Sequence, residues 1–393
     1  MLNKKYRIGI DASNIRQGGG ITHLSQLLQH AEPDLSEISR VVVWSNQKTL
    51  NKLPEKKWLI KQSNKRLDGN FLSRTLWQVF KLDRALEEFN CDLLFVPGAS
   101  FKAKFRPVVS MHQNQLPFEW AEILRYGFSF MTLKWILLRM TQSLSFKKSN
   151  GIIFLSKYSK DSLIKIINKQ DIVNKIIPHG VEDRFFSSPK EQFSIENYST
   201  KNPLKIIYIS TIDFYKHQWN IAEAVKSLKR QGYPIDLKFY GSANSRALKK
   251  LKKVIIDSNR NKYNENDYIS YNDEVSFTKI ENVYFNADIS IFASSCETFG
   301  QIVLESMAAG LPIACSNMSS MPEILKNSAV LFDPLNVKDI TNCLKKLIDS
   351  KGQRTFISSR AAEIAQDFSW KKTAFLTFEF FKEVSQQDEL KRK

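Results

Sequence analysis

Residues 289–312 read ISIFASSCETFGQIVLESMAAGLP, and this stretch decides how the chain is expected to fold. The apolar run Ile289–Ala293 predicts a buried strand, and a polar loop leads from it to Gly300, where a helical pattern begins that stops at Gly310. A strand, a loop and a helix in this order are typical of a parallel sheet. The free N–H groups at the start of such a helix can bind a diphosphate, and Gly300 lets the backbone approach it closely.

The same alternation of short β-branched runs and longer helical patterns extends through the chain on both sides of this stretch. In the first half the expected strands are Tyr6–Ile10, Val41–Trp44, Leu93–Val96, Val108–Met111, Gly151–Leu155 and Lys175–Ile177. In the second half they are Leu204–Ser210, Leu237–Tyr240, Tyr268–Tyr271, Ile289–Ala293, Leu311–Ala314 and Val330–Phe332. Ligands of open parallel sheets bind beyond the carboxyl ends of the strands, so functional residues are expected there.

A polar stretch with two prolines, Ser187–Pro203, lies between the two series and is interpreted as a linker. A chain of 393 residues is long enough for two domains, each with its own core. The predicted domains are residues 1–190 and 191–370. The aromatic-rich pattern that follows predicts a helix over residues 371–385, which we expect to pack back on the first domain.

The positive charge of the chain is concentrated in its first half. Residues 1–190 contain 30 basic and 16 acidic residues, a net charge of +14, and the remainder carries +4. This asymmetry is typical of a protein with an anionic partner, whether nucleic acid, an acidic membrane surface or a phosphorylated substrate. A lysine-rich surface without a specific partner explains it equally well.

The cysteines and histidines do not follow the spacing of metal ligands or of a disulfide framework. No protein-held metal is therefore predicted, and the four scattered cysteines suit a reducing compartment. The polar N-terminus leads directly into a strand, so no secretory signal is visible and a cytoplasmic location is expected.

The segment Phe118–Lys148 combines many apolar residues with basic ones such as Arg125, Lys134 and Lys148. Its apolar run is too short to span a bilayer, which takes about 20 residues. An apolar face with basic flanks is typical of a helix that lies on a membrane surface. A core helix of the first domain with solvated basic residues is the alternative.

Glu297 and Glu305 are the candidate polar ligands of the stretch quoted above. One lies in the loop and the other eight residues later, two turns into the helix, so both carboxylates can face one cleft. Carboxylates only accept hydrogen bonds when ionised, and they could therefore bind two separate groups of hydroxyls on one nucleotide sugar.

With its flanking residues, this stretch resembles the E-x7-E signature of the retaining GT-B glycosyltransferases of family 4. The elements that follow are similar too, in order and spacing: Ala308-Ala309-Gly310, Leu311-Pro312-Ile313, Met321-Pro322-Glu323-Ile324 and Phe332-Asp333-Pro334. The resemblance covers most of residues 200–370. It implies an α/β fold of the GT-B type, with two Rossmann-like doubly wound domains facing a cleft.

The resemblance also implies roles for the residues of the motif. The first acid, Glu297, would contact hydroxyls of the transferred sugar, and the second, Glu305, would contact the ribose of the nucleotide. Backbone groups of Phe299, Gly300 and Gln301 would contact the sugar or the phosphate. The hydroxyl of Thr298 could add a contact.

A second family element is a basic pair after the first strand of the C-terminal domain, normally an arginine and a lysine that hold the diphosphate. Lys216 matches the lysine, but Ser210 and Thr211 stand where the arginine is expected. The charge of the leaving group would then be met by hydroxyls, by Lys216 alone or by a basic residue of the other domain.

In the first half, the glycine-rich turn before the first helix and one histidine match further family elements. The resemblance implies that Gly19 or Gly20 approaches the donor phosphate or the acceptor, and that His112 lies near the reacting sugar. Glycine-rich turns are common, and a lone histidine is often only a structural hydrogen-bonding group.

The sequence therefore predicts a retaining glycosyltransferase that moves a hexose from a nucleotide-sugar donor to a glycan or polyprenyl-diphosphate-linked acceptor, in bacterial surface polysaccharide synthesis such as O-antigen or capsule. It predicts no cofactor, no metal and no nucleic-acid partner, with peripheral membrane contact through residues 118–148. The alternatives are another sugar-nucleotide enzyme of this fold, such as a 2-epimerase or a phosphorylase, a partner subunit whose site has decayed, and a basic nucleic-acid-binding protein.

Overall fold

The computed structural model describes residues 4–16, 18–259, 267–273 and 279–392. Two compact units make up the chain. Unit 1 comprises residues 1–118, 130–180 and 369–393, and unit 2 comprises residues 119–129 and 181–368. The chain thus leaves unit 1 for the eleven residues 119–129 and then returns to it. It leaves unit 1 again after residue 180 and returns at residue 369.

Unit 1 is built on a seven-stranded parallel sheet with the order β3-β2-β1-β4-β5-β6-β7. Its strands are β1 (Tyr6–Asp11), β2 (Ile38–Trp44), β3 (Leu59–Gln62), β4 (Leu93–Val96), β5 (Val108–His112), β6 (Gly151–Phe154) and β7 (Val173–Ile176). Parallel neighbours need crossover connections, and the helices between the strands provide them. They are α1 (Gly19–His30), α2 (Gln47–Leu50), α3 (Lys65–Asp68), α4 (Phe71–Phe80), α5 (Leu82–Glu88), α6 (Trp120–Leu124), α7 (Phe130–Lys148) and α8 (Lys157–Ile167), of which α6 belongs to unit 2.

Helices cover both faces of this sheet, because successive side chains of a strand point to opposite sides. Val96 packs with residues of α5 in one core cluster, whereas its neighbour Phe95 contacts Phe381 of the C-terminal helix α16 (Trp370–Arg392). Gly151 shows how closely α16 lies on the sheet, since a Cβ there would come within 2.9 Å of Val384. The last helix of the chain is therefore part of the core of unit 1.

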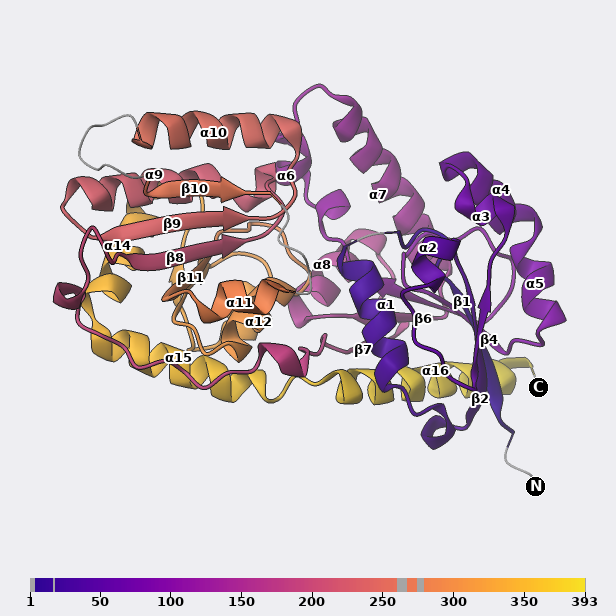
Figure 1. Ribbon diagram of the computed structural model, residues 1–393. Coiled ribbons are helices and arrows are strands. Elements are labelled where there is room, and N and C mark those ends of the chain that lie inside the picture. The colour runs from indigo at the N-terminus through magenta and orange to yellow at the C-terminus, as the bar shows by residue number, and fades with distance from the viewer. Residues whose placement is uncertain (1–3, 17, 260–266, 274–278, 393) are drawn as a thin grey trace. The chain divides into compact units, whose positions relative to one another are not determined.

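Unit 2 has a six-stranded parallel sheet with the order β10-β9-β8-β11-β12-β13. Its strands are β8 (Leu204–Ile209), β9 (Ile235–Tyr240), β10 (Ile269–Asn272), β11 (Ile289–Phe292), β12 (Ile313–Ser316) and β13 (Val330–Phe332). Its other helices are α9 (Gln218–Arg230), α10 (Ser245–Asn259), α11 (Ile280–Phe285), α12 (Gln301–Ala308), α13 (Met321–Leu325), α14 (Val337–Asp349) and α15 (Lys351–Ala365). Figure 1 shows α9 and α10 on one face of the sheet and α11 and α12 on the other.

Each of the twelve expected strands is present, with its ends displaced by three residues or fewer. Among the described residues β3 is a further strand, at the edge of the first sheet, where Leu59 is buried and Ile60, Lys61 and Gln62 are half-buried. An edge strand buries less apolar surface than a central one, so its sequence carries a weaker pattern.

The segment Phe118–Lys148 forms two helices rather than one. It is divided at Gly127, whose φ of +61° lies in the left-handed region that favours glycine. The part before the break, with α6, packs in unit 2, and α7 packs in unit 1. Within the described residues, none of the helices has the length and the apolar run that crossing a bilayer requires.

Gly241, at the end of β9, provides a test of the packing in unit 2. Its φ is +131°, and a Cβ there would lie 2.4 Å from the carbonyl oxygen of Ser210, which follows β8. We expect Gly241→Ala to lower the free energy of unfolding by about 2 kcal/mol or more, because backbone strain and a clash with main chain combine. Urea denaturation followed by tryptophan fluorescence measures this effect.

Gly352→Ala is the matched control, because nothing lies within 4 Å of a Cβ at that position in α15. This substitution should be neutral or slightly stabilising, since alanine is the better helix former. Equal losses of stability in the two variants would contradict the packing argument.

Candidate active site

The candidate site in unit 2 lies where the strand order of the sheet reverses. β8 and β11 are neighbours at the centre of the sheet, and the strands on either side of them follow in opposite directions along the chain. In parallel α/β sheets the loops diverge at such a position and leave a crevice at the carboxyl ends. The loops after these two strands, residues 210–217 and 293–300, carry most of the predicted site residues.

The loop after β11 leads into α12 through Gly300. This residue has a φ of +98°, and a Cβ would lie 2.4 Å from the terminal methyl group of Met321. Gly300 is thus favoured by the backbone conformation whether or not a ligand binds, whereas a Cβ would meet only the flexible end of Met321. The side chains of Thr298 and Phe299 are buried, and the Ser320 hydroxyl lies 3.2 Å from the carbonyl oxygen of Phe299. The start of α12, with Gln301 as its first residue, is therefore held in place without a ligand.

Lys216 and Glu297 meet across the two loops and form an ion pair. Lys216 is buried, and its ammonium group lies 4.8 Å from the ring centroid of Phe292 at the end of β11. The Glu297 side chain is 18% exposed, so one side of the pair remains accessible. Two opposite charges are thus brought together beside the start of α12, although 81 residues separate them in the chain.

The turn that carries Lys216 is fixed by its neighbours. Asp213 caps the 3-10 helix Phe214–Lys216 by accepting a hydrogen bond from the Phe214 amide at 2.8 Å. His217 follows with a φ of +51°, and its Nε2 lies 2.8 Å from the Ser295 hydroxyl in the loop after β11. Burial lowers the pKa of His217 to about 3, and the positive charges of Arg125 and Lys250 lower it further. His217 is therefore neutral at pH 7 and can serve as a structural hydrogen-bonding group.

Glu305 is the fifth residue of α12, about one turn into the helix rather than the two turns expected, and it is buried there. Its carboxylate accepts a hydrogen bond of 2.8 Å from the Tyr284 hydroxyl of α11. Burial raises the pKa of the carboxyl to about 7, partly opposed by this hydrogen bond and by the charge of Arg184. A carboxyl that ionises near neutral pH is poised to accept hydrogen bonds from an entering polar ligand.

Ser210 and Thr211, where the family has its arginine, lie in the loop after β8. The Ser210 amide donates to the Tyr240 carbonyl at 2.9 Å, and the Thr211 hydroxyl lies 3.3 Å from that of Ser242. Ser210 is buried, and Thr211 is exposed. The structure thus places hydroxyl groups, rather than a guanidinium group, on this loop.

Residues 119–129 pack against the loop after β8 in unit 2, which the sequence did not reveal. Tyr126 is almost fully buried, and its hydroxyl donates to Asp213 at 2.8 Å. Its ring meets that of Phe214 edge-on, and its carbonyl oxygen accepts a hydrogen bond of 3.1 Å from Arg246 of α10. A segment from the first half of the chain therefore supports the turn that carries Lys216. The aromatic residues of this segment were the signal in the sequence that indicated a packing role.

The predicted residues of the first half lie in unit 1. Gly19 and Gly20 begin α1 after a left-handed Gly18, and nothing lies within 4 Å of a Cβ built at Gly19. His112 ends β5 and is 1% exposed, with the rings of Phe118, Phe146 and Phe154 packed around it. Burial lowers the pKa of His112 to about 4. This histidine is neutral at pH 7.

Within the described ranges, no group of three or more histidine, cysteine, aspartate or glutamate residues could hold a metal ion. The four cysteines are buried and unpaired. At the candidate site, the polar groups that the described residues bring together include the Lys216–Glu297 ion pair, the buried carboxyl of Glu305, hydroxyls and the amides at the start of α12.

Part of the chain is similar to a known protein family. Residues 189–364 match the family model described as "Glycosyl transferases group 1". The O-antigen chain mannosyltransferase B of Escherichia coli is 23% identical over 243 residues, which are 59% of this chain and 60% of that relative. The aligned region thus spans less than two thirds of the relative's own length.

Two solved structures share the fold over nearly their whole length. A glycosyltransferase from Rickettsia africae has a TM-score of 0.69 at 16% identity, covering 97% of this chain and 98% of its own. Anabaena HepE, solved in complex with UDP-glucose, has a TM-score of 0.68 at 17% identity, covering 98% and 99%. These neighbours and the two parallel sheets confirm the predicted fold class, two Rossmann-like α/β domains of the GT-B type. The part of the chain that is similar to the group 1 family model, residues 189–364, falls within unit 2.

The raised pKa of Glu305 makes stability depend on pH. Below its unfolded pKa, near 4.5, the carboxyl is protonated in both states, and between 4.5 and about 7 only the unfolded chain ionises. This group therefore destabilises the fold as pH rises through that window, by about 3 kcal/mol in all. Glu305→Gln removes the ionisation and keeps an acceptor for Tyr284. The variant should gain stability relative to the parent at pH 8 but not at pH 4.5, as measured by urea denaturation.

Glu323→Gln, at an exposed position of α13, is the control. A stability difference between Glu305→Gln and the parent that stays constant from pH 4.5 to pH 8 would show that Glu305 ionises normally.

Proposed function

We propose that this protein is a retaining glycosyltransferase that transfers a hexose from a nucleotide-sugar donor bound to unit 2. The observation that carries the proposal is the Lys216–Glu297 ion pair beside the start of α12, at the strand-order reversal of a parallel sheet. A cation and the free amides of a helix start suit the diphosphate of the donor. The carboxylate suits the hydroxyls of its sugar.

In the proposed reaction the bond between the sugar and the diphosphate breaks while negative charge grows on the departing phosphate. Stabilisation of such charge by fixed donors is usually the largest catalytic contribution. Lys216 and the amides at Gly300 and Gln301 supply it here, with the hydroxyls of Ser210 and Thr211 in place of the missing arginine. The acceptor hydroxyl would attack on the face that the phosphate leaves, and the phosphate would take its proton. This scheme retains the anomeric configuration and requires no resident metal.

Glu297 and Glu305 would bind opposite ends of the donor. Glu297 would exchange Lys216 for sugar hydroxyls, and Glu305 would accept hydrogen bonds from the ribose. A buried carboxyl with a pKa near 7 gains from such donors, because they favour its ionised form. In unit 1, His112 is proposed to lie near the reacting sugar, and Gly19 or Gly20 to approach the donor phosphate or the acceptor.

The proposed pathway is the synthesis of a bacterial surface polysaccharide. It is supported by the similarity to an O-antigen chain mannosyltransferase, and the choice of a nucleotide-sugar donor is supported by the fold shared with a protein solved with UDP-glucose. The nucleotide base and the sugar are best found by a thermal-shift panel of UDP- and GDP-sugars, because a ligand that binds the folded state raises the melting temperature.

A partner subunit with a decayed site is the second candidate, because Thr211 replaces the arginine of the family. The two candidates differ in one observable: only the enzyme releases nucleoside diphosphate from its donor.

Lys216→Ala and Glu297→Ala should each lower the rate of sugar transfer by about 100-fold or more, since each removes a group that stabilises the transition state. The release of nucleoside diphosphate from the donor identified by thermal shift measures the rate.

Lys226→Ala is the matched control, because Lys226 is also buried and ion-paired, with Asp257, but lies on α9 away from the strand ends. Its transfer rate should match that of the parent. Full activity in either site variant would remove that residue from the mechanism.

We further propose that the acceptor is linked to a lipid diphosphate and that unit 1 contacts the membrane peripherally from the cytoplasmic side. The helix α7 has no acidic residue, and its exposed apolar side chains recur at intervals of three and four, the spacing of one helix face. They are Phe130, Leu133, Leu137, Met140 and Leu144. The helix α4 exposes a second apolar face, with Phe71, Leu72, Leu76, Val79 and Phe80. Exposed apolar faces of this kind mark interaction sites.

The double variant Leu133→Asn/Leu137→Asn should bind vesicles that contain phosphatidylglycerol about tenfold more weakly than the parent, because it removes two apolar side chains from the contact. Co-sedimentation at low salt measures the binding. Leu335→Asn/Phe356→Asn, at exposed positions of unit 2, is the control and should bind like the parent. Recovery of the parent protein wholly in the supernatant would rule out the membrane contact.

A further inference from the structure

The helix α10 of unit 2 presents a strongly basic face. Its fifteen residues include five basic side chains and one acidic side chain, Asp257. Arg246, Lys249, Lys250 and Lys253 follow one another at the i, i+3, i+4 and i+7 positions and therefore lie on one face of the helix. All four are exposed, while Ala247 and Leu251 are buried and anchor the helix.

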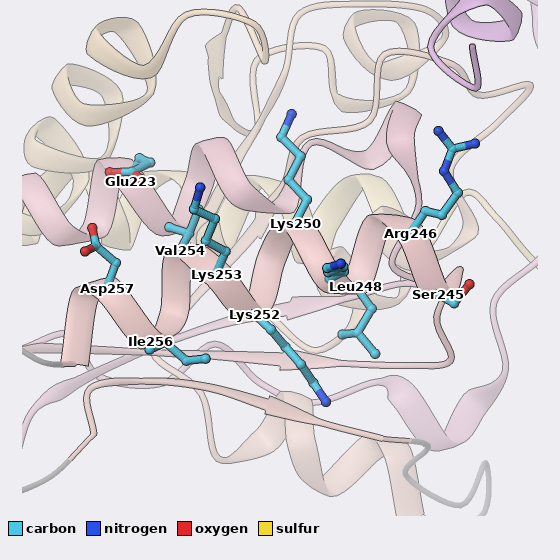
Figure 2. A pocket seen from close by; sticks show the side chains of 11 residues that line it. Glu223, Ser245, Arg246, Leu248, Lys250, Lys252, Lys253, Val254, Ile256 and Asp257 are labelled. Atoms are coloured by element: carbon cyan, nitrogen blue, oxygen red, sulfur yellow. The ribbon is translucent and has the colours of Figure 1, made fainter. Parts of the chain in front are cut away.

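The basic side chains lie around an open hollow of about 1170 Å3 along α10. Figure 2 shows Arg246 and Lys250 extending to the same side of the helix, whereas Lys252 extends to the opposite side. The ammonium group of Lys250 lies 3.9 Å from the ring centroid of Trp219 on α9. Partial burial lowers the pKa of Lys250, and the positive charge of Arg125 lowers it further. Like charges are therefore crowded here, as they are where an anionic partner binds.

An apolar group of side chains adjoins the basic end of this face within the same unit. Arg246 donates to the carbonyl oxygen of Tyr126, which ties the segment 119–129 to α10. Figure 1 shows α6 beside the N-terminal end of α10. From this segment Leu124 is 66% exposed and Phe128 is fully exposed, and Trp120 is half exposed. Two aromatic rings and a leucine thus project from the protein next to a row of cations.

We propose that the basic face of α10 and the exposed side chains of Trp120, Leu124 and Phe128 form an anionic-lipid-binding surface of the donor unit. Basic residues within a Debye length of an anionic leaflet are attracted to it, and neighbouring aromatic and aliphatic side chains enter the boundary between headgroups and acyl chains. Unit 2 then holds the membrane through its own surface, in addition to the contact of unit 1. This inference rests on the proposed membrane contact and extends it to the unit that binds the donor.

Two other occupants fit the observations less well. A second copy of the chain would have to bring two rows of four cations together in an isologous contact, which repel each other. Nucleic acid would be attracted by the charge, but it offers little to a leucine that is two-thirds exposed. A lipid surface uses both the cations and the apolar side chains.

The double variant Lys249→Glu/Lys253→Glu tests the charged half of the surface. Each basic residue near an anionic surface strengthens binding about fivefold, and a glutamate in its place adds repulsion. The variant should therefore bind vesicles that contain phosphatidylglycerol at least about 25-fold more weakly. Leu124→Asn/Phe128→Asn tests the apolar half and should weaken binding about tenfold. Lys338→Glu/Lys345→Glu, at exposed positions of α14, makes the same change in net charge and should bind within about twofold of the parent. Unchanged melting temperatures establish that the variants are folded.

The outcomes separate this inference from the proposed function. Equal losses of vesicle binding in the α10 and α14 variants would mean that binding depends only on net charge. That result would overturn the proposed lipid-binding surface. Binding by the α10 variant at the level of the parent, with loss in Leu133→Asn/Leu137→Asn, would overturn the α10 surface and leave the membrane contact of unit 1 intact. If the parent does not bind vesicles, the membrane contact of both units is wrong. If the parent binds duplex DNA more tightly than vesicles, the surface binds nucleic acid instead. If the parent is a dimer and the α10 variant is a monomer, the surface is a contact between two copies of the chain.

Discussion

The ion pair between Lys216 and Glu297 is the interaction on which the candidate site depends. A lysine this deeply buried is costly without a partner, and removing one member of such a pair leaves an uncompensated charge. In the absence of a ligand each residue satisfies the other. A donor with a diphosphate and a hydroxylated sugar would offer new partners to both residues at once. The ion pair therefore keeps Lys216 and Glu297 charged and in position until such a ligand binds.

The support behind this pair comes from a distant part of the chain. Asp213 caps the turn that ends at Lys216, and the hydroxyl of Tyr126 donates to Asp213. Tyr126 belongs to the eleven residues that the first half of the chain contributes to unit 2. The same segment carries the exposed apolar side chains next to α10. A buried tyrosine therefore connects the turn of the candidate site with the surface that we propose to bind anionic lipids.

The predictions from sequence succeeded where one local pattern carried the information. The central strands are apolar on both faces and were found with small shifts, whereas β3, at the sheet edge, was missed because half of its residues are polar. Gly300 was recognised as the start of a helix, but its contact with Met321 is long-range and has no signature in the local sequence. The break of the segment Phe118–Lys148 at Gly127 could have been suspected from the glycine, but not the assignment of its two parts to different units.

The sequence by itself determined the alternation of strands and helices, the position of Gly300 before α12 and the spacing of Glu297 and Glu305, because each depends on the chain's local periodicity. Only the tertiary structure decided which groups meet: Lys216 with Glu297, Glu305 with Tyr284, and Tyr126 with Asp213. The physical reason is that strand order in a parallel sheet is set by the packing of whole βα units. Residues far apart in the chain become neighbours only once β8 and β11 lie side by side.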